Sequence, residues 1–458
     1  MITWPLQFRE TSGGSVLFCD EAGGFFRSNE SFLERFAMGK LNNKDAEFLL
    51  SQGHAFSSED DYRYAGFASR WANRITPRSD LNYVILVPTL RCNLRCDYCQ
   101  VSRVAEEATG FDWNDDDLQR VINFLDDLKT RNIKVEFQGG EPLLRLDILQ
   151  EVREFCRNRF DRSEFVVCTN LQSVTAEAWA FLDAADTHIS TSFDGTEESH
   201  LAGRTKTQAV QDEFEANLRE AVSRFGVERV SALPTIDVNN SPDPDEFIRS
   251  YVDFGFRSIF LRRINFQGFA RKAFTSLEES ELWRSYYRRF IEAVIAYNSV
   301  NDEKIEEFYL THLLRRIFRG GHHNHVDLRN PNWLGADYLV IDFDGRIYPT
   351  DEARMVTRVG QIDLSIGSLS QGLDSNKLEW LNSEVCNSFN PDCMMCPYQA
   401  FCGTDIVDDL SRYGRVDMPK EQTYHCRSHL DLFDLAFDLI YSEDEKVKNS
   451  VAVWLGVP

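Results

Sequence analysis

The sequence lacks any long apolar run, and no stretch reaches the roughly 18 residues that a membrane-spanning helix needs. Its first ten residues, Met-Ile-Thr-Trp-Pro-Leu-Gln-Phe-Arg-Glu, lack the basic and then apolar segments of a signal peptide. Basic residues are also few: 50 Lys and Arg stand against 73 Asp and Glu, for a net charge of −23. So acidic a surface repels phosphate backbones and anionic lipids. We therefore expect a cytoplasmic protein whose partners include neither nucleic acid nor membrane.

Cysteine, in contrast, is abundant. Eleven cysteines is a high number for a reducing compartment, where disulfides seldom persist, and an odd number does not make a closed disulfide set. Seven of them fall into two clusters, which favours metal binding. The chain has 458 residues and 43% hydrophobic composition, enough for two or three globular domains.

Residues 1–80 are predicted to form a small separate domain. Three short strands are followed by two helices, at 6–10, 15–19, 24–28, 31–38 and 44–51. This β+α order resembles the winged-helix elements that bind precursor peptides by adding a strand to their sheet. A plain packing module with no ligand is the alternative.

Between residues 81 and 270, apolar strands alternate with amphipathic helices. The strands are predicted at 83–88, 134–138, 165–169, 188–193, 229–236 and 258–262, and the helices at 115–129, 146–157, 176–184, 208–225 and 245–254. Six βα repeats indicate an α/β fold in which a parallel sheet curls into a partial (β/α)6 TIM-like barrel. In such barrels the chemistry lies at the C-terminal ends of the strands.

The remaining chain is predicted to hold two further parts. Residues 271–330 form bridging helices that end in the loop Gly320-Gly321-His322-His323-Asn324-His325, which we interpret as a loop rather than a metal site. Residues 331–458 form a cysteine-rich domain that opens with a hairpin around Asp344-Gly345.

The first cysteine cluster directly follows the first barrel strand. Cys92, Cys96 and Cys99 have the spacing C-x3-C-x2-C, and Tyr98 precedes the last of them. Iron–sulfur clusters usually take four thiolates, so three on one loop leave one iron open to an outside ligand. This pattern resembles the radical S-adenosylmethionine (SAM) superfamily, which implies a [4Fe–4S] cluster whose open iron binds SAM.

Three more segments resemble the SAM-binding parts of that superfamily. Gln138, Gly139, Gly140 and Glu141 end the second strand in a Gly-Gly-Glu-Pro turn, where glycines allow close approach and a carboxylate accepts bonds from an ammonium. The resemblance implies that this turn holds the SAM amino group. It likewise implies that Ser192 and Arg204 bind the SAM ribose and carboxylate.

The second cluster has the spacing C-x2-C-x5-C…C at Cys393, Cys396, Cys402 and Cys426. It resembles half of the seven-cysteine pattern of SPASM domains, which extend peptide-modifying radical SAM enzymes. The match implies an outer auxiliary [4Fe–4S] cluster held entirely by protein. Thr350 and Ile406 occupy two positions at which the inner cluster requires cysteines, so we expect one auxiliary cluster instead of two. A four-cysteine zinc site is the alternative, and Cys386 is a substitute ligand or a bystander.

Asp351 is the candidate catalytic residue. In related sulfatase-maturing enzymes, the aspartate at the matching position is the base that takes the substrate proton. Its neighbour Glu352 is the alternative base, and a merely solvated aspartate at a hairpin end is the plain interpretation.

Together, segments 137–144, 230–233, 256–262, 268–270 and 348–355 resemble the His-Xaa-Ser system radical SAM maturases of the HxsB type. That resemblance implies an enzyme that reductively cleaves SAM and abstracts hydrogen from a ribosomally made precursor peptide, most simply to form an oxidative side-chain cross-link. The expected partners are a peptide with His-Xaa-Ser repeats, an electron donor such as flavodoxin or ferredoxin, and a second radical SAM enzyme. A peptide epimerase, a formylglycine-type maturase and a non-catalytic zinc-bound peptide adaptor are the alternatives.

Overall fold

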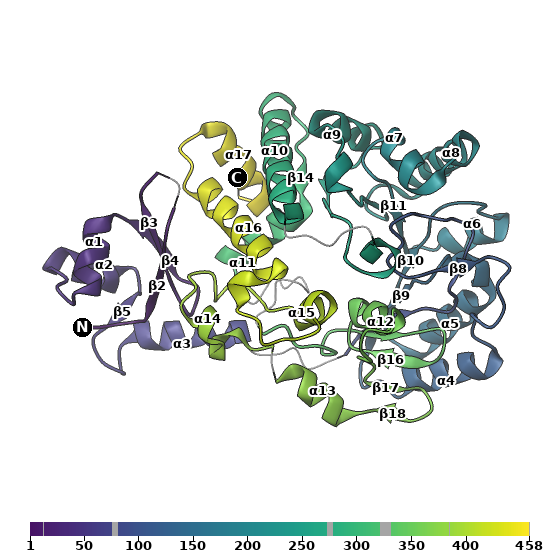
Figure 1. Ribbon diagram of the computed structural model, residues 1–458, viewed down its shortest axis with the longest axis horizontal. Helices are drawn as coiled ribbons and strands as arrows, with labels where there is room; N and C mark the ends of the chain where they lie inside the picture. Colours follow the sequence, from purple (N-terminus) through teal and green to yellow (C-terminus); the bar gives the residue numbers. More distant parts are fainter. Residues whose placement is uncertain (12, 76–80, 273–277, 321–330, 384, 458) are drawn as a thin grey trace.

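A computed structural model describes residues 1–458 except 12, 76–80, 273–277, 321–330, 384 and 458. In Figure 1 the N-terminal residues, in purple, form one end of the molecule, and the strands and helices of the predicted barrel, in blue and teal, form the other. The long helices α10 (Glu278–Val300) and α16 (Tyr424–Ile440) lie between these two ends, together with α17 (Glu445–Leu455).

The N-terminal unit is built on a three-stranded antiparallel sheet with the order β2-β3-β4. Its elements are β2 (Leu6–Glu10), β3 (Val16–Asp20), β4 (Phe25–Ser28), α1 (Glu30–Ala37), α2 (Asn43–Ser51) and α3 (Tyr62–Ile75), with the small pair β1 (Ile2–Thr3) and β5 (Ala55–Phe56). Phe18, Phe26 and Phe32 are the large side chains of its core. The three strands and first two helices confirm the prediction, whereas α3, β1 and β5 were not predicted.

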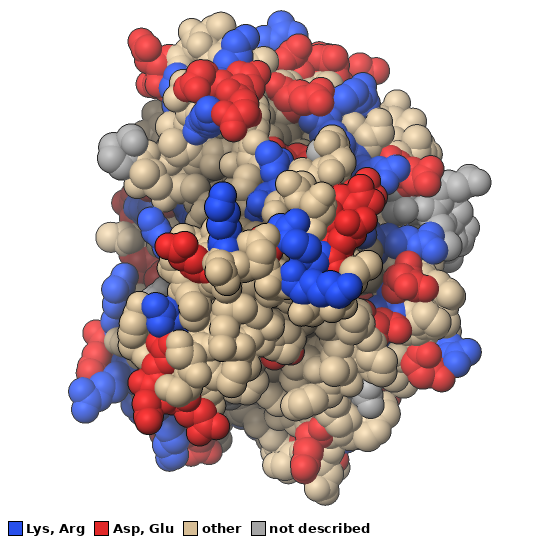
Figure 2. All heavy atoms as spheres, turned by 90° about the vertical axis from the view of Figure 1, so that its left-hand side faces the viewer, with Lys and Arg blue, Asp and Glu red and all other residues tan. Residues whose placement is uncertain are grey.

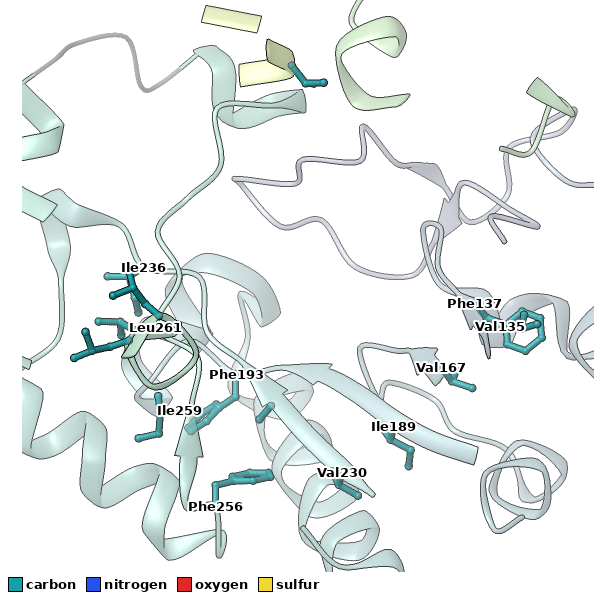
Figure 3. Packing of buried hydrophobic residues seen from close by; sticks show 14 of the residues in the cluster. Val135, Phe137, Val167, Ile189, Phe193, Val230, Ile236, Phe256, Ile259 and Leu261 are labelled. Atoms are coloured by element: carbon teal, nitrogen blue, oxygen red, sulfur yellow. The ribbon is translucent and has the colours of Figure 1, made fainter. Parts of the chain in front are cut away.

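The barrel sheet contains five parallel strands in the order β12-β11-β10-β9-β6. They are β6 (Tyr83–Leu86), β9 (Asn132–Phe137), β10 (Arg162–Cys168), β11 (Thr187–Ser192) and β12 (Val230–Leu233). The connecting helices are α4 (Asp115–Asp126), α5 (Leu146–Arg159), α6 (Ala176–Leu182), α8 (Gln208–Phe225) and α9 (Pro244–Asp253). Alternate strand residues such as Val135, Val167 and Ile189 are buried side by side, as Figure 3 shows, and their neighbours therefore face the barrel interior.

The predicted sixth strand at 258–262 is wrong in extent. Only β13 (Ser258–Ile259) is a strand, and it pairs with β14 (Glu306–Glu307) in a separate two-stranded sheet. One isolated bridge, between Ile236 and Arg263, joins this segment to the chain that follows β12. Phe260 packs against Tyr309 with parallel rings at 5.7 Å, and this contact with the bridging helices competes with barrel pairing.

The C-terminal part continues the barrel sheet. β15 (Leu339–Ile341) pairs in parallel with β6, and β16 (Arg346–Tyr348), β17 (Gly367–Ser368) and β18 (Gly372–Leu373) extend a nine-stranded sheet in antiparallel fashion. The hairpin at Asp344-Gly345 is confirmed. The other helices here are α11 (Phe308–Phe318), α12 (Asp351–Arg358), α13 (Ser375–Asn382), α14 (Pro391–Met394) and α15 (Ile406–Tyr413). Most of the predicted loop at 320–325 lies outside the described residues.

Within the described ranges, no helix is long and apolar enough to cross a membrane. The acidic excess is also not uniform over the surface. Figure 2 shows the face at the N-terminal end, where acidic and basic side chains are interspersed around uncharged surface.

Candidate active site

One cavity of about 490 Å³ brings together most of the residues that the sequence singled out. It lies where the barrel strands end and the C-terminal hairpin begins, and we call it the barrel cavity. The predicted residues that line it are Cys92, Cys96, Tyr98, Cys99, Gln138, Gly139, Gly140, Ser192, Arg204 and Asp351. These residues come from segments up to 259 positions apart, so only the fold assembles them.

The glycine pair brings its turn against the cysteine loop. Gly139 has φ +143°, and a Cβ there lies 2.2 Å from the Thr89 carbonyl oxygen. A Cβ at Gly140 lies 2.2 Å from the Arg91 carbonyl oxygen, immediately before Cys92. No L side chain fits either position without backbone movement. The two glycines therefore let this turn pack directly against the cysteine loop as well as border the cavity.

Hydrogen-bond donors surround the three thiols. The Leu94 N–H and the Asn170 amide approach the Cys92 sulfur at 3.4 and 3.7 Å, and an Arg204 Nη approaches the Cys96 sulfur at 3.9 Å. Burial raises the pKa of Cys92 to about 12, so a metal has to displace protons from these thiols to bind. Three thiols on one loop, supplied with outside donors and a guanidinium, fit a [4Fe–4S] cluster with one iron open.

Glu141 is buried at the end of β9, and its role toward the SAM amino group stays a prediction. Its side chain is 1% exposed, and its two oxygens accept the N–H groups of Leu143 at 3.1 Å and Asn170 at 2.8 Å. Burial raises its pKa to about 7. Glu141 thus joins the end of β9 to the loop after β10, and the same loop supplies Asn170 to Cys92. No local pattern indicated Asn170, because its contact with Cys92 depends on the order of the strands in the sheet.

Arg204 is held by a buried carboxylate that the sequence analysis did not single out. Its Nε lies 3.1–3.2 Å from both oxygens of Asp194, and Nη2 donates to the Thr235 hydroxyl at 3.3 Å. The Tyr98 hydroxyl donates to the same carboxylate. Arg204 therefore reaches Cys96 from a fixed position, while its role toward a SAM carboxylate stays a prediction.

Other polar residues that were not predicted line the barrel cavity as well, among them Glu136, Cys168 and Ser190. The Cys168 thiol donates to Glu136 Oε1 at 3.2 Å, and Gln138 Nε2 donates to the same oxygen at 2.7 Å. The alternation of side chains along a strand could have indicated two of them. Glu136 and Ser190 each lie two residues before a predicted site residue and therefore face the same side of their strands. Cys168 is half-buried and lines the cavity.

Asp351 is the first residue of α12 and lines the barrel cavity. Its Oδ1 accepts a hydrogen bond from Arg354 Nε at 2.8 Å and lies 2.7 Å from Nη2 in an ion pair, and Arg354 is fully buried. Thr350 caps the helix by accepting the Ala353 N–H at 3.1 Å. Glu352 lines the barrel cavity as well as an adjoining one. The structure thus brings both candidate bases to the cavity wall.

The second cysteine set lines a different cavity, of about 260 Å³. Cys393, Cys396, Cys402 and Cys426 all border it, and burial raises the pKa of each thiol. Cys386 is not among the residues that border it. Four thiols around one cavity fit an auxiliary [4Fe–4S] cluster.

Two observations bear on the metal and on the cluster number. In the part of the chain that the structure describes, no three His, Cys, Asp or Glu side chains converge on a single ion position. A four-cysteine zinc site brings its thiolates to one ion, whereas each thiolate of a [4Fe–4S] cluster binds a different iron, so metal analysis distinguishes the two. Thr350 serves as a helix cap and Ile406 is buried at 3% exposure, so both inner-cluster positions have structural roles.

Comparison with known proteins supports this arrangement. Residues 86–250 match the model of the radical SAM superfamily. An uncharacterized protein of Methanocaldococcus jannaschii is 25% identical over 185 residues, which cover 39% of this chain and 61% of that protein. A cysteine-type anaerobic sulfatase-maturating enzyme of Clostridium perfringens is 22% identical over 389 residues, which cover 80% of this chain and 99% of the relative.

Solved structures show the same fold. Native anSMEcpe with bound AdoMet superimposes with a TM-score of 0.62 at 18% identity, over 81% of this chain and 99% of the other. The same protein with bound AdoMet and the Kp18Cys peptide gives a TM-score of 0.61. These likenesses do not test the narrower HxsB-type resemblance, which stays a prediction. With its cysteine loop at the head of a partial barrel, the chain carries a radical SAM domain over residues 86–250.

Proposed function

We propose that the protein is a radical SAM maturase that modifies a polypeptide oxidatively, most simply by cross-linking two of its side chains. One observation carries this proposal: the barrel cavity joins the thiols of Cys92, Cys96 and Cys99 to the carboxylates of Asp351 and Glu352. A bound [4Fe–4S] cluster and SAM supply the one-electron chemistry that removes a hydrogen atom from a carbon. A relative named as a sulfatase-maturating enzyme and a neighbour solved with a peptide support a polypeptide substrate.

The residues of this chain have separate roles in that proposal. Cys92, Cys96 and Cys99 would hold the cluster, and Gly139 and Gly140 keep the wall beside it free of side chains. Tyr98, Gln138, Ser192 and Arg204 supply the polar lining that SAM would contact. The enclosing walls exclude water from the reacting carbon.

Asp351 is the proposed general base. Forming a cross-link removes two hydrogens: one leaves as a hydrogen atom, and the other leaves as a proton and an electron, which an auxiliary cluster at the second cysteine set would accept. The buried Arg354 guanidinium holds the Asp351 carboxylate in place at the cavity wall through an ion pair. We expect Asp351→Asn to lower modification at least about a hundredfold while SAM cleavage, measured as released methionine, continues. If Glu352→Gln gives that loss and Asp351→Asn does not, Glu352 is the base.

A second candidate, peptide epimerisation, is favoured by the position of Cys168. Its thiol faces the barrel cavity and is not part of either cluster set. Transfer of a hydrogen atom from its Sγ to a substrate Cα radical breaks S–H and forms C–H. The thiyl left on Cys168 then needs one electron and one proton from a low-potential donor protein.

Mass mapping of a co-expressed peptide separates these functions. The peptide is encoded by a small neighbouring gene and is produced with and without the enzyme. A cross-link lowers the mass by about 2 Da, whereas an epimer keeps its mass and gains about 1 Da per site in D₂O. Conversion of serine to formylglycine also removes about 2 Da, so a carbonyl-specific hydrazide identifies that aldehyde. An unmodified peptide, together with zinc in place of iron, overturns the proposal in favour of a zinc-bound adaptor.

The proposed partners follow from the same function. Residues 1–80 would bind a precursor peptide, and β2 and β4 are the edge strands of that sheet, where strand addition takes place. The peptide with His-Xaa-Ser repeats, the flavodoxin or ferredoxin and the second radical SAM enzyme belong to this proposal too. A cytoplasmic location is also part of this proposal, because all eleven cysteines are free and disulfides seldom persist in that compartment.

A further inference from the structure

Two adjacent arginines stand at the junction of two cavities. A second cavity, of about 210 Å³, adjoins the barrel cavity and lies against α10 and α16; we call it the side cavity. Four residues line both cavities: Phe260, Arg262, Arg263 and Glu352. The arginines follow β13, at the C-terminal end of the sixth barrel position, where barrel enzymes bind their substrates.

The other arginines of the side cavity are paired with carboxylates. Arg284 lies 3.1 Å from Asp431, Arg288 lies 3.7 Å from Asp438, and Arg412 contacts Asp408 at 2.9 Å. Arg262 and Arg263 differ, because no carboxylate among the described residues forms an ion pair with either. Two guanidinium groups without an ion pair among the described residues therefore face the cavities of a chain whose net charge is −23.

Arg263 is also fixed in position. One Nη donates to the Ser428 hydroxyl at 3.0 Å, and the guanidinium lies over the Tyr424 ring at 4.0 Å. Arg412 lies over the same ring at 3.8 Å. Burial lowers the pKa of Arg263, while the nearby Asp408 carboxylate, which pairs with Arg412, acts in the opposite direction. A guanidinium has five N–H donors, and the Ser428 hydroxyl takes only one of those on Arg263.

We propose that Arg262 and Arg263 bind a carboxylate of the polypeptide substrate and so hold the neighbouring residue in the barrel cavity. A planar guanidinium matches a carboxylate in two parallel hydrogen bonds, and an anion there compensates both charges. The carboxylate is either an aspartate or glutamate side chain or the free C-terminus of the peptide. This inference rests on the proposed function, because it assigns a substrate feature to the same cavity.

Arginine footprinting tests the binding site without requiring catalysis. The full-length, iron-reconstituted protein with SAM present throughout is treated with phenylglyoxal, and modified arginines are mapped by mass spectrometry. Three probes are compared: N-acetylaspartate amide, N-acetylalanine and N-acetylasparagine amide. We expect one of the two carboxylate probes to slow modification of Arg262 and Arg263 at least about threefold, and the asparagine probe to have no effect. The effective probe identifies the source of the carboxylate, and Arg284 is the internal reference. Equal rates with all three probes overturn the proposal.

Variants test the consequence for the substrate. We expect Arg263→Gln to lower modification of the co-expressed peptide at least about tenfold, and Arg284→Gln, which removes the same charge from a paired arginine, to change it less than about threefold. Replacing the critical acidic residue of the peptide by its amide should lower modification by the wild-type enzyme to the same extent. With Arg263→Gln, the same replacement should lower modification little further. A tenfold loss of SAM affinity in Arg262→Gln or Arg263→Gln, without protection by a carboxylate probe, assigns the pair to SAM and overturns the proposal. Protection without any peptide modification instead contradicts the proposed function.

Discussion

Glu307 is a buried carboxyl whose protonation links pH to stability. Its oxygens accept the N–H groups of Leu261 at 3.0 Å and Leu310 at 2.7 Å, and the Tyr287 hydroxyl donates to it as well. Burial nevertheless raises its pKa to about 7, from 4.5 in the unfolded chain. The native state therefore binds a proton more tightly than the unfolded state does.

We expect the free energy of unfolding to fall as the pH rises from about 4.5 to about 7. Over this range the unfolded chain loses the proton of Glu307 while the native state still binds it. The contribution of one such group is about 3 kcal/mol. Denaturant titrations of the protein at several pH values measure it. Glu307→Gln should flatten the profile, and Glu303→Gln, at an exposed carboxylate, should not. A profile that stays unchanged in Glu307→Gln contradicts the assignment.

The two cysteine sets predict distinct iron contents. Two four-iron clusters give roughly eight irons per chain, and Cys92→Ser should leave roughly four. Cys168→Ser is the matched control, because Cys168 lines the same cavity and its thiol contacts Glu136. Iron analysis of the anaerobically reconstituted proteins provides the measurement. Eight irons in Cys92→Ser would show that this cysteine is not a ligand.

At the scale of elements, the turn after β9 predicts a steric effect. A Cβ at position 140 lies 2.2 Å from the Arg91 carbonyl oxygen and 2.5 Å from that of Leu90. We expect Gly140→Ala to displace the cysteine loop, to reduce iron to roughly four per chain and to destabilise the protein by about 1–3 kcal/mol.

The control for this substitution is Gly66→Ala in α3. The nearest atom to its Cβ is an Arg70 Nη at 3.6 Å, so the methyl group fits. Alanine should stabilise this helix by about 0.5–1 kcal/mol and leave the iron content unchanged. If both variants keep eight irons, the glycine pair does not position the cysteine loop.

The elements also differ in how well local pattern predicted them. α8 was predicted at its observed bounds, because eighteen residues of helical periodicity are a strong local signal. β13 was predicted too long, because an apolar segment suits a strand or a cavity wall equally well. Its actual partner, β14, lies 47 or 48 residues further along the chain, and no local pattern identifies it.

At the scale of the whole molecule, the N-terminal unit is joined to the rest by aromatic packing. Phe25 of β4 contacts four rings from other parts of the chain: Phe318, Phe401, Phe437 and Tyr441. The bidentate ion pair of Arg9 with Asp434, 2.8 Å at each bond, adds a second connection beside the second cysteine set.

We expect Phe25→Ala to lower the free energy of unfolding by about 3 kcal/mol and to speed proteolytic cleavage between residues 1–75 and the barrel. Phe48→Ala is the control, since Phe48 contacts Phe26 within the N-terminal unit. Limited proteolysis followed by mass spectrometry compares the two. Equal cleavage rates would show that the N-terminal unit does not depend on this packing.

The sequence by itself determined the two cysteine sets, the glycine turn and the alternation of strands with helices. These depend on spacing along a few consecutive residues, and the chemistry of thiols and the backbone limits of glycine act at that range. Only the tertiary structure decided that Glu141 binds backbone amides, that Cys168 faces the barrel cavity, and that β15 joins the barrel sheet. The tertiary structure also decided that Arg262 and Arg263 have no ion pair among the described residues. A residue's partner depends on which distant segments the core brings beside it, and spacing along the chain carries no record of that.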